Sequence, residues 1–246
     1  MKGLLYKDLL LSRKYYFVVF LYCMLFALIA VLMRISMICG NLSDNKEVVE
    51  SLSRNMYILR YTPGAAMLIA FINDGGTDYS DIRSGWLLFS RTTALRPEKL
   101  VGARFVFKAS ALTAALIFSL VYMIVFGLTG GDGITPGMLR NIFSVYFLSM
   151  AVSFFATALA FVFRKKQISQ IICVGTVGVA GLLLTTLMIV KLDKIDASKD
   201  FDLLDFLKGE FSGIINYILP AAAALFVISA VLSYITSVKA LKRREG

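Results

Sequence analysis

The residues whose types and spacing could do chemistry lie in one loop, Asn73–Arg104, between two long apolar stretches. Ile82, Trp86 and Phe89 follow at i, i+4 and i+7, which predicts one apolar stripe on a short helix. A helix with an aromatic stripe and basic flanks either lies on a membrane surface or fits a groove on a soluble partner, and composition leaves both open. The charged residues around the stripe are Asp81, Arg83, Arg91, Arg96 and Lys99.

Several catalytic chemistries have no residues to carry them. The chain has no histidine, which excludes Ser–His proteolysis, His-ligated zinc and bis-His haem. It has no G-x-x-x-x-G-K-[ST] loop to hold nucleotide phosphates, and no pair of acids in the middle of an apolar stretch. We therefore expect no catalytic residue, metal site or cofactor in this chain. A transport role powered by another chain, or a non-catalytic membrane role, remains.

Six apolar stretches must position that loop. Each is near the roughly 20 residues that an α-helix needs to cross about 30 Å of hydrocarbon. In lipid every backbone polar group must be satisfied within the segment, so helices are expected. The sequence predicts an all-α membrane protein of one domain, residues 1–246, with six transmembrane helices. The predicted spans are 15–33, 56–72, 105–128, 142–163, 168–190 and 214–238.

The basic residues predict which side is cytoplasmic. The N-terminal tail, the 73–104 loop with Lys108, the 164–167 turn and the C-terminal tail hold 17 of the 26 Lys and Arg, against 6 acidic residues. The other face holds 9 basic and 10 acidic residues. Cytoplasmic connections collect Lys and Arg, so we expect both termini and the loop in the cytoplasm. Topology and anionic lipid explain the net charge of +10, so no nucleic-acid partner is expected.

Residues 1–14 mix leucines with charged residues. The mixture predicts an N-terminal elbow helix that lies in the cytoplasmic interface before the chain turns into the bilayer. The leucines are spread around the helix, however, so the alternative is a helix continuous with the first span.

Three residues inside the predicted spans are unusual. Arg60 lies about one turn inside the outer end of the second predicted span. A charge at the bilayer centre costs about 2.5–3.5 kcal/mol, and a charge nearer the interface costs less. Its side chain either extends to the outer headgroups or faces a polar cavity on a substrate path. Pro63 could flex or kink the same helix, and Pro220 in the last span predicts a kink or a broken helix.

Small residues in the fourth span, at Ser149/Ser153 and Ala156/Ala160, have the spacing that lets helices approach closely. We expect them to pack against other helices of the subunit or against a second subunit.

The stretch DYSDIRSGWLLFSRTTALRPEKLVGARFVF, residues 78–107, resembles the intracellular loop of ABC-2 type transporter permeases of Gram-positive bacteria. In that family a Gly-Trp helix precedes a run T-P-x-[KR]-P-E-K-L-V-x-x-[KR] that leads into the third span. The opening MKGLLYKDLLLSRKYY is similar to the family's elbow helix. Ala94 departs from the run, because the family often has proline there, and two glycines precede Asp78 in place of the common aromatics.

The resemblance implies a permease subunit of an ATP-driven exporter in a bacterial plasma membrane. Two six-span subunits, either two copies of this chain or this chain and a homologous permease, would each rest on a separate cytoplasmic ATPase that binds ATP and Mg. Residues 78–95 would be the coupling helix, with Trp86 and Phe89 as buried anchors. The implied ATPase-coupling residues are Asp81, Arg83, Trp86, Phe89, Arg91 and Arg96.

The substrate is expected to be apolar or amphipathic, because few charges lie within the spans. Relatives of this size include exporters of amphipathic peptides such as phenol-soluble modulins, so peptide export is the favoured function. The alternatives are efflux of a lipid, an antibiotic or an antimicrobial peptide for self-immunity, or a non-transporting scaffold or sensor subunit. Arg60, Pro63 and Pro220 are the predicted residues of the substrate pathway.

Overall fold

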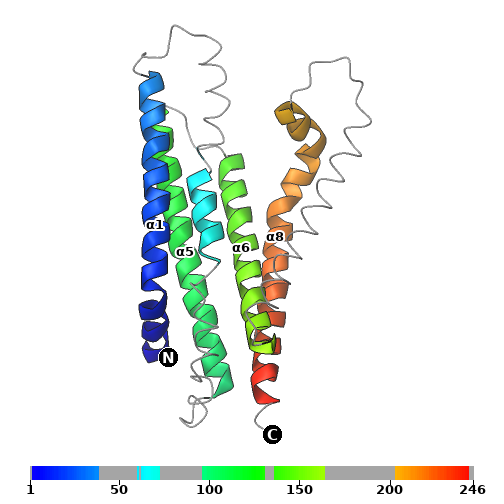
Figure 1. The fold of residues 1–246 in the computed structure, drawn as a ribbon. Helices are drawn as coiled ribbons and strands as arrows, with labels where there is room; N and C mark the ends of the chain where they lie inside the picture. Colours follow the sequence, from blue (N-terminus) through cyan, green and yellow to red (C-terminus); the bar gives the residue numbers. More distant parts are fainter. Residues whose placement is uncertain are drawn as a thin grey trace.

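The computed structural model describes residues 2–38, 60, 62–72, 96–130, 136–163 and 203–243, and these ranges form a helical bundle without strands (Figure 1). A short unlabelled helix occupies residues 62–70. The all-α class is therefore confirmed over the described ranges. The labelled helices are α1 (Lys2–Ile38), α5 (Pro97–Gly130), α6 (Pro136–Phe163) and α8 (Leu203–Lys242).

Four of these helices, α1, α5, α6 and α8, are long and apolar enough to cross a membrane. They contain the predicted spans 15–33, 105–128, 142–163 and 214–238. The predicted span 56–72 is helical at Arg60 and over 62–70. Positions 56–59 and 61, and the whole predicted span 168–190, lie outside the described residues. The membrane-protein character of the chain is thus supported, whereas the count of six spans stays a prediction.

The first residues of α1 and the last residues of α8 lie at the same end of the bundle (Figure 1). We call this the terminal end. α1 and α5 run side by side away from the terminal end, and α6 and α8 run together back towards it (Figure 1). α5 contacts each of the other three labelled helices, so it lies at the centre of the described bundle.

Two helices begin at a proline, and the sequence explains why. Pro97 and Pro136 are the first residues of α5 and α6. Proline suits this position because the first turn needs no backbone N–H donor and the ring already holds a helical φ. Glu98 follows in the first turn of α5, where a negative charge is favourable.

The separate N-terminal elbow helix predicted for residues 1–14 is wrong, because α1 is one helix of 37 residues. At about 1.5 Å per residue it is roughly 55 Å long, well beyond the hydrocarbon thickness. Residues at the expected bend are instead held by their neighbours. The Tyr15 hydroxyl donates to the Ala70 carbonyl at 2.9 Å, and the Tyr16 ring lies 4.6 Å from that of Phe71.

Hydroxyl and small residues make the close contacts between helices. Ser149 and Ser153 of α6 are buried, and Ser153 Oγ lies 3.5 Å from the Ile72 carbonyl oxygen. Ser229 of α8 donates to the Ala151 carbonyl of α6 at 2.8 Å. Small residues let backbones approach, and hydroxyls then bond across the helices. The close packing expected of the fourth span is confirmed within the subunit.

The broken helix considered at Pro220 is also absent, since α8 continues through this proline. Proline removes one backbone hydrogen bond and presses on the preceding turn. Helices that span membranes tolerate it because neighbouring groups satisfy the freed carbonyl.

Candidate functional site

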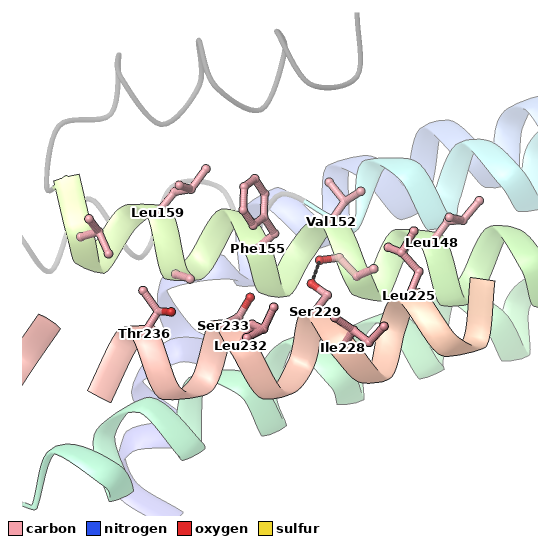
Figure 2. A pocket seen from close by; sticks show the side chains of 13 residues that line it. Leu148, Val152, Phe155, Leu159, Leu225, Ile228, Ser229, Leu232, Ser233 and Thr236 are labelled. Carbon is pink, nitrogen blue, oxygen red and sulfur yellow. Dashed lines mark hydrogen bonds between the residues drawn. The ribbon is translucent and has the colours of Figure 1, made fainter. Parts of the chain in front are cut away.

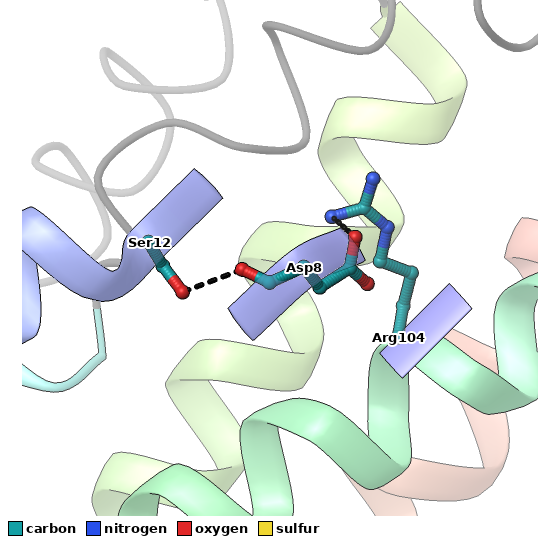
Figure 3. Close-up of polar contacts among 3 residues, drawn as sticks. All are labelled: Asp8, Ser12 and Arg104. Carbon is teal, nitrogen blue, oxygen red and sulfur yellow. Dashed lines mark hydrogen bonds and ion pairs between the residues drawn. The ribbon is translucent and has the colours of Figure 1, made fainter. Parts of the chain in front are cut away.

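A buried ion pair joins α1 to α5 in the half of the bundle that holds the terminal end. Arg104 Nη1 lies 3.2 Å from Asp8 Oδ1, and the two side chains are only 7% and 3% exposed (Figure 3). Ser12 Oγ donates to the backbone carbonyl of Asp8 at 2.7 Å (Figure 3). Lys108, one turn after Arg104, is also buried. A buried charge is costly without a partner, so this pair fixes how α1 packs on α5.

The sequence did not indicate this pair, although two signals were present. Asp8 is the only acidic residue among the first 43, and it stands among leucines. Arg104 and Lys108 are four residues apart at the start of the third predicted span, and therefore share one face of a helix. A lone acid in an apolar segment, and two cations on one face entering a span, each suggest a buried partner.

A second ion pair ties the first turn of α5 to the last turn of α8. Lys242 Nζ lies 2.5 Å from Glu98 Oε1, and both side chains are substantially exposed. The hydrogen bond from Lys242 lowers the pKa of the Glu98 carboxyl below its ordinary value. Lys242 also stands at the helix C-terminus, where a positive charge is favourable. The start of α5 is thus held on two sides, by α1 and by α8.

The structure describes only one of the six predicted ATPase-coupling residues. Arg96 is exposed and directly precedes Pro97 at the start of α5. The stretch 73–95 connects Ile72 to Arg96. The ring of Tyr16 packs on that of Phe71, before this stretch, and its centroid lies 6.1 Å from that of Phe107, after it. The chain on both sides of 73–95 therefore lies beside the N-terminal half of α1. The predicted coupling residues outside the described part of the chain are Asp81, Arg83, Trp86, Phe89 and Arg91.

Two of the three predicted pathway residues are buried in the second span. Arg60 is 4% exposed and Pro63 is fully buried, so both lie inside the protein. Beside them, Gly64 packs directly on α5: its carbonyl accepts a hydrogen bond from Ser119 Oγ at 3.0 Å. Pro220, in contrast, lies at an exposed position of α8. The structure therefore gives Pro220 a different environment from Arg60 and Pro63.

An apolar groove of about 690 Å³ runs between α6 and α8 (Figure 2). A smaller recess of about 320 Å³ lies at the terminal end and shares two lining residues with the groove, Val162 and Thr236. Lys239 and Arg243 line the recess. The sequence did not predict this site, because its residues come from two helices that are far apart in the chain. The groove walls include Leu148, Phe155 and Leu159 of α6 and Leu225, Ile228 and Leu232 of α8 (Figure 2).

Within the described ranges, no group of three or more Cys, Asp or Glu side chains could hold a metal ion. Comparisons with protein-family models, with curated proteins and with solved structures give no match to this chain. The candidate functional features are therefore the two ion pairs at the start of α5 and the groove with a basic end.

Proposed function

We propose that this chain is the permease subunit of an ATP-driven exporter of the ABC-2 type, and that a separate cytoplasmic chain hydrolyses the ATP. The anchoring of the start of α5 carries the proposal. The run RPEKLVGAR, residues 96–104, is the part of the family-like loop that the structure describes. Its Glu98 bonds to Lys242 of α8, and its Arg104 bonds to Asp8 of α1.

These two pairs provide a mechanical route from the loop to the membrane helices. A helix moves as a rigid element, and packed elements shift together when one end is displaced. A partner that moved residues 78–95 would therefore displace α5, and through the pairs also α1 and α8. In the proposed mechanism two ATPase chains close on ATP and Mg, and this motion tilts the helices of two permease subunits. Trp86 and Phe89 are the proposed anchors in the ATPase.

The proposed cargo is an amphipathic or hydrophobic peptide that leaves a bacterial cell across the plasma membrane. Support comes from the apolar character of the spans. Each of the four long helices has an 18-residue stretch with at most two charged residues, and the cation of the predicted second span, Arg60, is buried. Arg60 and Pro63 are proposed to face the path directly. Pro220 is proposed to let α8 bend as the path opens, since proline weakens the helix there.

Co-purification tests the proposal. We expect the gene to adjoin one for a soluble P-loop ATPase, and the tagged chain should be expressed with that ATPase. We expect a complex with two copies of each chain, whose ATPase activity responds to an added amphipathic helical peptide. The chain alone should hydrolyse no ATP, because it has no loop that holds the phosphates. A chain that forms no such complex and keeps its cellular effect without an ATPase would be a scaffold or sensor, and the proposal would fail.

A further inference from the structure

The groove between α6 and α8 has the dimensions of a lipid tail. Its α6 wall runs from Leu148 to Val162, a rise of about 21 Å, which covers the roughly 15 Å depth of hydrocarbon in one leaflet. Its volume, about 690 Å³, falls in the range of ligand pockets, about 300–1,000 Å³. Among the described residues, α6 and α8 alone supply the lining of the groove (Figure 2).

The chemistry of the groove also suits a hydrocarbon chain. Ten of its thirteen described lining residues have apolar side chains, and the other three are Ser229, Ser233 and Thr236 (Figure 2). The Ser229 hydroxyl, drawn in Figure 2, donates to the Ala151 carbonyl at 2.8 Å and so is already satisfied. Ser233, also on the lining, is 3% exposed. An extended peptide would bring many backbone polar groups into this groove, whereas an acyl chain brings none.

One end of the groove is basic. The adjoining recess is lined by Lys239 and Arg243, whose side chains are exposed. Neither forms an ion pair with another described residue, in contrast to Lys242, which is bound to Glu98. The negative end of α8 accounts for a preference for cations here. It does not account for a recess that opens into an apolar groove, and a guanidinium beside an ammonium is well suited to bind phosphate.

We propose that this site binds one anionic phospholipid, with an acyl chain in the groove between α6 and α8 and the phosphate at Lys239 and Arg243. The two lining residues shared by groove and recess, Val162 and Thr236, lie where the tail meets the headgroup. The cations lie at the terminal end, which is the side predicted to face the anionic cytoplasmic leaflet. This lipid site does not depend on whether the chain exports a peptide.

Native mass spectrometry of the full-length chain in detergent tests the proposal. The protein should be delipidated and titrated with dioleoyl-phosphatidylglycerol and, separately, with dioleoyl-phosphatidylcholine. We expect one phosphatidylglycerol per chain, bound more tightly than phosphatidylcholine. The Lys239→Gln/Arg243→Gln double variant should bind phosphatidylglycerol roughly thirty-fold more weakly, because each surface cation contributes about a factor of five to anionic-lipid binding.

Two further variants decide between the possible occupants. Arg13→Gln/Lys14→Gln removes the same charge from exposed positions of α1 outside the site, and should leave phosphatidylglycerol binding unchanged. Thr236→Trp places an indole at the junction of groove and recess, at an exposed position, and should weaken binding of both lipids. Equal affinity of the parent for the two lipids, or an equal loss in the α1 variant, would overturn the proposal. So would a Thr236→Trp variant that changes only the oligomeric state, since a second copy would then cover the groove.

Discussion

At the scale of single residues, burial separates charges that look alike in the sequence. Asp8 and Arg104 are almost fully buried, whereas the Glu98 and Lys242 side chains are 39% and 54% exposed. The sequence could predict that these residues lie near the membrane boundary, because cations collect on one side of a membrane protein. It could not predict which charges pair. Asp8 and Arg104 are 96 positions apart and meet only because α1 packs on α5.

Removing one charge of the buried pair should therefore matter more than removing one of the exposed pair. Asp8→Asn removes the carboxylate charge that faces Arg104 in a buried site, and we expect a loss of about 3 kcal/mol in the free energy of unfolding. SDS titration of the protein in mixed micelles measures this. Glu98→Gln is the matched control at the same end of the bundle, and should change stability little because water screens the exposed pair. Equal losses in the two variants would contradict the structural role of Asp8.

At the scale of elements, the sequence predicted the four long described helices well and their ends poorly. Four apolar stretches lie within helices long enough to span a membrane, because hydrophobicity over about 20 residues is a strong signal. The elbow expected before residue 15 was wrong because tertiary contacts, including those of Tyr15 and Asp8, hold α1 helical through it. The break considered at Pro220 was wrong because a helix in a bundle can absorb one missing hydrogen bond.

The contact between the second span and α5 leaves no room for a side chain at Gly64. A Cβ there would lie 2.9 Å from Ser119 Cβ and 3.2 Å from Ser119 Cα. Gly64→Ala should therefore cost about 1–3 kcal/mol of unfolding free energy, as overpacking does in tight cores. Thermal unfolding in detergent, followed by scanning fluorimetry, measures the loss.

Second-site variants identify the cause of that loss. Gly64→Ala/Ser119→Gly removes the clashing Cβ and should recover part of the stability, whereas Gly64→Ala/Ser119→Ala keeps that atom and should not. Gly137→Ala, in α6 with no atom within 4 Å of the new Cβ, should be neutral or slightly stabilising. If Gly137→Ala were as destabilising as Gly64→Ala, close packing would not be the cause.

At the scale of the whole molecule, the terminal end gathers the features that bear on function. The start of α1 and the end of α8 lie there, as do the Glu98–Lys242 pair and the basic recess. α5 rises from this end through the centre of the described bundle. The predicted coupling residues other than Arg96 lie in 73–95, outside the described part of the chain. The structure therefore supports a membrane protein with four long apolar helices among the described residues.

The predicted six-span topology can be tested with reporter fusions. Reporters fused after Gly246 and within residues 84–90 should both indicate cytoplasm, because cations collect on that side. A reporter near Asp196 should indicate the outside, since five spans would precede it. Reporter pairs that are active only in one compartment, such as fluorescent protein and alkaline phosphatase fusions, measure this. An outside signal from the 84–90 fusion would contradict both the six-span arrangement and the coupling role of the loop.

The coupling segment itself gives the last prediction. Truncation of a central aromatic anchor commonly costs about 2 kcal/mol or more, so Trp86→Ala should weaken binding of the ATPase roughly thirty-fold or more. Co-purification and titration of the labelled ATPase onto the permease in nanodiscs measure the change. Trp86→Phe should retain much of the affinity, because an aromatic ring would still occupy the proposed binding site on the ATPase. Phe17→Ala, which removes an exposed aromatic from α1 outside the loop, should not affect it.

All three variants should insert into the membrane normally, because no single substitution here removes a span. If Trp86→Ala instead bound the ATPase like the parent while the 78–95 segment lost contact with lipid, this segment would be a surface anchor. In the proposed mechanism, the motion that opens the path would then have to reach this chain through another segment.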